Sequence, residues 1–217
     1  MDPKSPQKRI RSYLTYVRDV FGAELLVNRD KKMTELDLYR QSIEQCTKCA
    51  LSQTRKHFVF GDGSPDADIL FVGEAPGAVE DETGIPFVGR AGKLLDKALH
   101  HIGLDRDRIF ITNVLKCRPP GNRDPLPDEI ALCEPYLHRQ IELLNPRVIV
   151  ALGRIAARTL LRLPSDTSLT SMRKQSFEYH GVPLCAFYHP AAILRNAGLE
   201  GEYFRDFEKL KEMYLKD

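Results

Sequence analysis

Four short apolar runs divide the chain, and none of them alternates between apolar and polar residues as a half-exposed strand would. They occupy residues 68–73, 108–113, 147–153 and 184–188. Runs of this length, bounded by turn residues, are typical of strands that are buried on both faces of a parallel sheet. Helical spacing occurs between and after them, at residues 89–102, 127–144, 154–163 and 198–215. The pattern predicts an α/β fold: a three-layer sandwich around a central, mainly parallel four-stranded sheet.

The N-terminal part has a different character. Residues 8–27 place apolar side chains at helical spacing, with a basic opposite face. Thr34 can cap a second helix that runs to about Gln45. The capping box is only partial by sequence, because the position three residues on holds Asp37 instead of glutamate or glutamine. We expect residues 1–36 to form a basic helical extension of a main domain.

The charge balance is mild and uneven. The chain holds 32 Lys and Arg against 30 Asp and Glu, a net charge of +2. Residues 1–36 hold eight basic and five acidic residues, so the remaining residues sum to −1. Phosphate binding by the main domain must therefore come from local clusters of charge. No run of about 18 apolar residues and no secretory signal is found, so we expect a soluble cytoplasmic protein without a membrane partner.

Five cysteines are present, an odd number that argues against a disulfide framework when no export signal is found. Cys46 and Cys49 form a CxxC pair, whereas Cys117 and Cys133 have 15 residues between them. Four thiolates in this arrangement can ligate zinc or an iron–sulfur cluster, the alternative being separate buried thiols. Cys185 lies in an apolar run and is expected in the core.

The loops after the predicted strands carry most of the reactive residue types. The first strand leads into a glycine-rich loop at residues 73–77, the second ends at Asn113, and the fourth leads to His189. Because the carboxyl ends of parallel strands gather at one edge of a sheet, these loops are expected to meet. The glycine-rich loop lacks the GxGxxG spacing, and no Walker lysine follows. Singly, the three features fit a tight turn, a helix N-cap and a loop histidine, but together they favour a binding site.

Three stretches, in order, resemble a known family. They are GEAPGAVEDETGIPFVGRAGKLL from residue 73, TNVLKCRPP from residue 112 and HPAAILRN from residue 189. With the four cysteines, they resemble the family 4 uracil-DNA glycosylases, the iron–sulfur enzymes of bacteria and archaea. The resemblance covers residues 37–215 and implies a glycosylase-like catalytic domain over residues 37–217. It implies hydrolysis of the N-glycosidic bond of deoxyuridine in single- or double-stranded DNA, which releases uracil and leaves an abasic site.

The resemblance also implies roles for the side chains of the expected pocket. Phe87 would stack on the flipped base, and Asn113 would pair with uracil N3–H and O4. His189 would stabilise the negative charge that develops at uracil O2. Glu80 would border the C5 edge and exclude the thymine methyl, the alternative being a solvated acid at a helix start.

The water-activating group is assigned less directly. Glu74 is a candidate for orienting water or stabilising the sugar cation, and the backbone of its loop is the alternative. The backbone of Ala75 and Gly77 is expected to contact the substrate.

The remaining implied residues contact DNA or hold a metal. Ile193 and Leu194 stand where the superfamily inserts an apolar wedge into the vacated base stack, unless they pack under the loop. Phosphate contacts are expected from Arg90, Arg118, Arg123 and Arg195. The resemblance makes Cys46, Cys49, Cys117 and Cys133 ligands of a structural [4Fe–4S] cluster, with zinc as the alternative. We expect a monomer.

Three other functions compete with this hypothesis. A protein that binds uracil-DNA very tightly through a covalent histidine would need a basic insertion that contains a histidine after the second strand. Residues 116–126 contain no histidine. An iron–sulfur sensor with little turnover would not need Phe87, Asn113 and His189 together. A preference for another deaminated base, such as hypoxanthine or xanthine, stays open, although Asn113 favours uracil.

Overall fold

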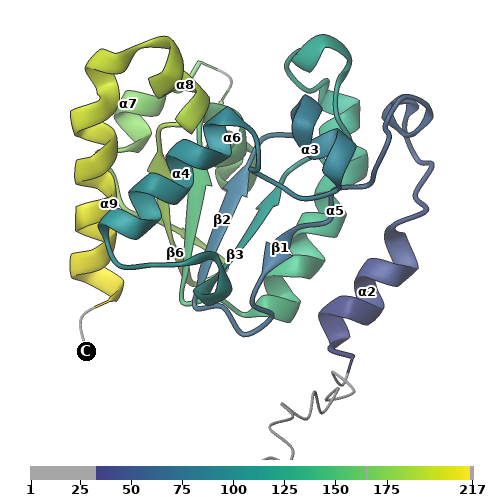
Figure 1. The fold of residues 1–217 in the computed structure, drawn as a ribbon, viewed down its shortest axis with the longest axis horizontal. Coiled ribbons are helices and arrows are strands. Elements are labelled where there is room, and N and C mark those ends of the chain that lie inside the picture. Colours follow the sequence, from purple (N-terminus) through teal and green to yellow (C-terminus); the bar gives the residue numbers. More distant parts are fainter. Residues whose placement is uncertain (1–32, 165, 216–217) are drawn as a thin grey trace, which may run out of the picture. The chain divides into compact units, whose positions relative to one another are not determined.

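The computed structural model describes residues 33–164 and 166–215, so the helix expected at residues 8–27 lies outside the described residues. Four parallel strands form the centre of the sheet (Figure 1). They are β2 (Ile69–Gly73), β3 (Ile109–Asn113), β4 (Val148–Leu152) and β6 (Val182–Phe187). They coincide with the four apolar runs, so the predicted parallel core is confirmed.

Two short antiparallel strands extend the sheet beyond the four that the sequence predicted. β1 (Asp62–Gly63) pairs with β3, and β5 (Phe177–Tyr179) pairs with β6. The complete order is β1-β3-β2-β4-β6-β5. Both additions are only two or three residues long and contain exposed positions, so neither produces an apolar run that sequence analysis could find.

Helices cover both faces of the sheet, which gives the predicted three layers. On one face, side chains such as Leu70 and Ile149 pack with Leu137 and Ala157 of the covering helices. These helices are α5 (Pro127–Leu144), α6 (Arg154–Leu161) and α7 (Leu169–Met172), and α2 (Glu35–Ile43) packs against α5.

The opposite face carries the alternate side chains of the same strands. Phe71 of β2 stacks on Phe207, with ring centroids 6.0 Å apart and an interplanar angle of 11°. Leu95 and Ile193 belong to the same apolar cluster. The covering helices are α4 (Arg90–His101), α8 (Pro190–Arg195) and α9 (Glu200–Tyr214). β2, β3 and β4 are therefore buried on both faces along their whole length, as their lack of alternation predicted, whereas β6 is only partly buried.

Helix α2 begins with a complete capping box, where the sequence indicated only a partial one. The Thr34 hydroxyl accepts from the Asp37 backbone N–H at 3.1 Å, and the Asp37 carboxylate accepts from the Thr34 N–H at 3.0 Å. Aspartate therefore serves as well as glutamate here. Leu36, in the first turn, is buried in the core, so this helix packs as part of the main domain.

Short helical turns occupy much of the segments expected to be loops. They are α3 (Ala78–Thr83) and the 3₁₀ turns η1 (Ala50–Gln53), η2 (Arg106–Arg108), η3 (Pro120–Asn122) and η4 (Ala197–Leu199). No helix in the described part of the chain has the length and apolar character needed to cross a membrane.

Candidate active site

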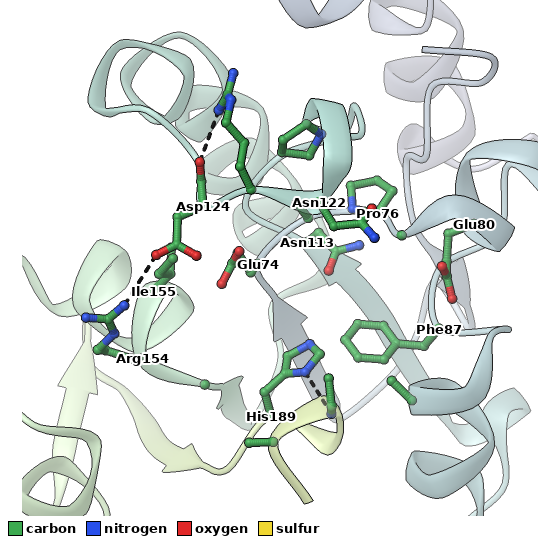
Figure 2. A pocket seen from close by; sticks show the side chains of 18 of the residues that line it. Glu74, Pro76, Glu80, Phe87, Asn113, Asn122, Asp124, Arg154, Ile155 and His189 are labelled. Atoms are coloured by element: carbon green, nitrogen blue, oxygen red, sulfur yellow. Dashed lines mark hydrogen bonds and ion pairs between the residues drawn. The ribbon is translucent and has the colours of Figure 1, made fainter. Parts of the chain in front are cut away.

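A cavity of about 470 Å³ lies at the carboxyl ends of β2, β3, β4 and β6, as parallel-sheet topology requires (Figure 2). Its volume suits a small organic ligand. The pocket residues predicted from the sequence all line it: Glu74, Ala75, Gly77, Glu80, Phe87, Asn113 and His189. The sequence therefore identified the side chains that the fold brings together here.

Asn113 ends β3 and is only 1% exposed. Its Oδ1 atom has no hydrogen-bond partner among the described residues. Leaving a buried acceptor unsatisfied costs about 1–3 kcal/mol, so such atoms mark places where a ligand can supply the donor. No helix follows directly, which removes the N-cap alternative for this residue.

Phe87 forms a wall of the same cavity, and its ring centroid lies 5.5 Å from that of His189 at an interplanar angle of 37°. Gly73, at the end of β2, explains how the ring comes so close to Asn113. A Cβ at Gly73 would lie 2.5 Å from Phe87 Cζ and would also collide with Asn113 Oδ1. Only glycine leaves room for the aromatic ring and the amide together.

Glu80, in α3, is nearly buried and is used by the protein itself. Its Oε1 atom accepts from the backbone N–H of Val88 at 3.0 Å and of Gly89 at 2.8 Å, just before α4. The solvated-acid alternative is therefore wrong. The carboxylate lines the cavity while it fixes the loop that carries Phe87.

His189 sits at the N-cap of α8, after β6. Its Nδ1 atom accepts a hydrogen bond from the Ala191 backbone N–H at 3.1 Å. Burial, with a smaller contribution from the Arg195 charge, lowers the pKa of His189 to about 4. The imidazole is therefore neutral near pH 7, and because Nδ1 is an acceptor, Nε2 carries the proton.

Glu74 follows β2 and points toward the centre of the cavity (Figure 2). Burial raises the pKa of this carboxyl to about 7, and the negative charge of Asp124 adds to the shift. Arg154 and Arg195 act in the opposite direction. A carboxyl that titrates near neutral pH is suited to hold or accept a proton during a reaction.

The side chain of a buried lysine, Lys116, contacts the backbone of Asn113. The Lys116 ammonium is fully buried and donates to the Asn113 carbonyl at 2.6 Å. It also donates to Thr112 Oγ1 at 2.7 Å and to Gln140 Oε1 at 2.5 Å. All three acceptors are uncharged, and burial lowers the pKa of Lys116 to about 7. Sequence analysis missed this residue because lysine is seldom fully buried.

The structure distinguishes among the four arginines that were predicted to contact phosphates. Arg90 and Arg195 are exposed. The guanidinium of Arg118 donates to Asn122 Oδ1 at 2.8 Å. Arg123 makes a bidentate pair with Glu129, at 2.9 and 2.7 Å, so its charge is already engaged.

Arg154, which sequence analysis missed, also lines the cavity and pairs with Asp124 at 3.4 Å (Figure 2). It follows β4, a strand that was predicted correctly. Ligands bind at the carboxyl ends of parallel strands, and this rule applies to the loop after β4 as well. The position of Arg154 after that strand could therefore have identified it as a cavity residue.

The two candidate wedge residues differ sharply in exposure. Ile193 is 4% exposed and packs in the core cluster beneath α8. Leu194 is 45% exposed. The prediction of a wedge at Ile193 is therefore wrong for this conformation, because the helical turn of α8 directs that side chain inward, and Leu194 is the residue that faces solvent.

The four cysteines of the predicted metal site come from three segments: residues 46–49, the loop after β3 and helix α5. Cys117 and Cys133 are buried in the core cluster, and Cys46 and Cys49 pack against it. Cys133 interacts electrostatically with the other three thiols. Within the described residues, no group of three or more His, Cys, Asp or Glu side chains is gathered as around a single metal ion.

The surroundings of these sulfurs suit thiolate ligands. The Tyr136 hydroxyl donates to Cys46 Sγ at 3.1 Å, and Arg55 donates to Cys117 Sγ at 3.2 Å. The Lys116 backbone N–H donates to Cys133 Sγ at 3.4 Å. Hydrogen bonds of this kind stabilise sulfur ligands of iron–sulfur clusters, so the donor set fits such a group.

Comparisons with known proteins identify the family to which the chain is similar. The model of the Uracil DNA glycosylase superfamily matches residues 60–212. The chain is 46% identical to the type-4 uracil-DNA glycosylase of Sulfurisphaera tokodaii, over 84% of this chain and 86% of that protein. It is 46% identical to the type-4 enzyme of Archaeoglobus fulgidus, over 83% and 94% of the two chains. It is 40% identical to the type-4 uracil-DNA glycosylase of Thermotoga maritima, over 84% of this chain and 96% of that protein.

Proposed function

The chain belongs to the uracil-DNA glycosylase superfamily, and we propose that its cavity takes up a deoxyuridine flipped out of DNA and hydrolyses the N-glycosidic bond. The products are free uracil and an abasic site. A base in a duplex must leave the stack before its glycosidic bond can be reached, which costs a few kcal/mol. The cavity at the sheet edge is large enough to receive it.

The buried amide of Asn113 is the observation that carries this proposal. Its unpartnered Oδ1 can accept from uracil N3–H while its Nδ2–H₂ donates to O4. Cytosine has an acceptor at N3 and an amino donor at C4, so both hydrogen bonds would be reversed. The hydrogen bond from Lys116 to the Asn113 carbonyl fixes the strand end from which the amide projects.

Phe87 and Glu80 shape the remainder of the base site. The Phe87 ring provides a face on which uracil stacks, and stacking of this kind contributes about 1–3 kcal/mol per base. Glu80, held by two backbone N–H groups, supports the segment 87–89 and borders the C5 edge. A thymine methyl would need room on that side.

His189 supplies the donor for the departing base. As the bond breaks, negative charge develops on uracil and positive charge on the sugar. The neutral imidazole donates from Nε2 to uracil O2, because Nδ1 already accepts from Ala191. A preorganised donor at a developing oxyanion typically contributes about 3–4 kcal/mol to transition-state stabilisation.

Glu74 is the group that we assign to the water. Its ionised carboxylate accepts a hydrogen bond from the attacking water and stabilises the positive charge on the sugar. With a pKa near 7, it is partly ionised at neutral pH. The backbone of Ala75 and Gly77 borders the same space and contacts the substrate.

Cys46, Cys49, Cys117 and Cys133 would hold a [4Fe–4S] cluster, supported by the donors from Tyr136, Arg55 and Lys116. The cluster would contribute structural cross-linking of the segments at residues 46–49 and 117–133. Zinc is the alternative for the same thiols.

We further propose that the protein acts as a cytoplasmic monomer on uracil in single- or double-stranded DNA. Arg154 and Arg195 line the cavity, and Arg90 and Arg118 lie in the segments that follow β2 and β3. These arginines would contact phosphates, and the exposed Leu194 would enter the vacated stack. Because Leu36 lies in the core, we place the boundary of the basic N-terminal extension before Thr34 instead of after residue 36.

The proposal is tested by comparing the release of different bases from otherwise identical DNA. Oligonucleotides that carry one uracil, thymine, cytosine or hypoxanthine are incubated with the protein, and the released base and the abasic site are quantified. The proposal predicts release from the uracil strand and none from the thymine or cytosine strand. Tight binding of uracil-DNA without release would favour a binding or sensing protein instead, and preferential release of hypoxanthine would overturn the assignment of Asn113.

A further inference from the structure

Phe87 adopts an unusual backbone conformation. Its φ angle is 53°, in the left-handed region that bulky residues rarely enter. The ring is nearly buried, with 5% of its surface exposed, and it faces the cavity. A conformation that is unfavourable in itself persists only where neighbouring groups hold it.

Arg106 holds the carbonyl side of this segment. Its Nη1 atom donates to the Pro86 carbonyl at 3.1 Å, and its Nη2 atom donates to the Phe87 carbonyl. Its Nε atom donates to Asp96 Oδ1 at 2.7 Å, which orients the guanidinium plane. Arg106 belongs to the 3₁₀ turn η2, remote in sequence from Phe87 and outside the cavity lining.

The opposite side of the same segment is held by Glu80, through the N–H groups of Val88 and Gly89. The carbonyl groups and the amide groups of four consecutive residues are thus held from different directions. Gly92 of α4 lets the segment lie directly on the helix, because a Cβ there would overlap the Phe87 carbonyl. The Phe87 backbone is therefore fixed from three sides.

We propose that Arg106 is a positioning residue for base recognition, which acts by holding the Phe87 ring in the orientation that stacks on uracil. This inference rests on the proposed function. Arg106 reaches two adjacent carbonyl oxygens and a carboxylate at once, which the planar fork of a guanidinium permits and a lysine ammonium does not reproduce. Lysine can therefore replace only part of this set of contacts.

The experiment compares Arg106→Met, Arg106→Lys and the control Arg108→Met with the wild type. Arg108 lies in the same 3₁₀ turn and its side chain is exposed. For each protein, the rate of uracil release from a single-uracil oligonucleotide, the inhibition constant of free uracil and the melting temperature are measured. Free uracil is the informative probe, because its affinity depends on the base site and is independent of DNA contacts.

Arg106→Met is expected to raise the inhibition constant of uracil about tenfold, because the misplaced ring loses part of its stacking contribution. It is also expected to raise KM for the oligonucleotide. Arg106→Lys is expected to recover part of this loss, and Arg108→Met to behave as the wild type. A fall in melting temperature with unchanged uracil inhibition would assign Arg106 a structural role only, and it would overturn the proposal. Should Arg106→Met fail to fold, Asp96→Asn keeps the arginine but frees its guanidinium, and it is expected to weaken uracil inhibition less.

A double-mutant cycle shows whether Arg106 acts through Phe87. Arg106→Met is introduced into Phe87→Leu, which lacks the aromatic face. If the arginine works by placing the ring, it adds little to the effect of Phe87→Leu, whereas full additivity contradicts the proposal. No uracil release by wild type and Arg108→Met alike would count against the proposed function itself, while an active wild type without this coupling would count against the Arg106 inference alone.

Discussion

The buried ammonium of Lys116 donates a 2.6 Å hydrogen bond to the carbonyl oxygen of Asn113. The backbone N–H of the same lysine donates to Cys133 Sγ at 3.4 Å. One residue thus connects the end of β3, whose Asn113 amide we assign to base recognition, to helix α5, which carries Cys133. The geometry of the base site and the packing around the cysteines are therefore physically linked.

Replacing Lys116 with methionine should impair uracil release. The substitution removes the donor that the Asn113 carbonyl, Thr112 Oγ1 and Gln140 Oε1 share. Gln140 Oε1 keeps the Thr112 hydroxyl as a donor, whereas an unsatisfied carbonyl at Asn113 costs about 1–3 kcal/mol. We expect kcat/KM for a single-uracil oligonucleotide to fall at least about tenfold. The control is Lys97→Met, since Lys97 is an exposed lysine that pairs with Glu200 on the surface. A variant with wild-type kcat/KM and bound iron would contradict the positioning of Asn113 by Lys116.

Glu74 should give uracil release a pH dependence centred near 7. Burial raises the pKa of its carboxyl to about 7, and the ionised form is the one that orients water. The single-turnover rate should therefore rise with pH between about 5.5 and 8.5, and Glu74→Gln should be slower by about 10²-fold with a flat profile. Identical pH profiles in the two proteins would remove Glu74 from this role.

The raised pKa of Glu74 also predicts how Glu74→Gln changes the stability of the fold. A pKa raised above the unfolded value of 4.5 means that the carboxyl contributes stability below that value, which is lost as the pH rises through about 7. The glutamine variant does not suffer this loss. Its melting temperature should thus increase relative to the wild type between about pH 5 and pH 8, and this change, measured calorimetrically, also shows that the variant is folded.

Leu194 and Ile193 should respond to truncation in different ways. Leu194→Ala removes an exposed side chain, so we expect an unchanged melting temperature. The rate of uracil release, relative to the wild type, should fall more on double-stranded than on single-stranded DNA. Ile193→Ala removes buried volume and should destabilise the fold by about 2–5 kcal/mol. Equal effects of Leu194→Ala on the two substrates would argue against a wedge.

The metal content of the purified protein should identify the group held by the four cysteines. We expect about four iron and four sulfide per chain, the composition of a [4Fe–4S] cluster. Cys46→Ala should lower the iron content and the melting temperature, whereas the control Cys185→Ala should leave the iron content unchanged, because Cys185 packs against the apolar cluster on the other face of the sheet. One zinc per chain, or iron content independent of Cys46, would refute the cluster.

The sequence predicted those parts of the molecule that depend on local pattern. Four unalternating apolar runs gave the parallel strands, and the topology of a parallel sheet then placed Asn113 and His189 at one edge. The edge strands β1 and β5 were missed because two or three residues carry no periodicity. The loop after β4 was overlooked although the same topological rule covers it.

The remaining features depend on tertiary contacts that no local pattern encodes. Arg106 stands in the charged run RDR, which by sequence resembles any solvated turn, and its partners are backbone carbonyl groups about twenty residues away. Lys116 can be buried because two acceptors at the end of β3 and one on α5 converge on its ammonium. The contrast between Ile193 and Leu194 follows from α8, a helix too short for sequence analysis to find.

The most direct test of the account is the single-turnover release of uracil from a single-uracil oligonucleotide by the wild type, Asn113→Ala and His189→Ala. Asn113 is assigned to base recognition and His189 to charge at O2, so both variants should fold and bind DNA. We expect release by the wild type and a loss of about 10²- to 10³-fold in His189→Ala, with a strong loss in Asn113→Ala. Wild-type rates in both variants, or a wild-type protein that releases no uracil, would contradict it.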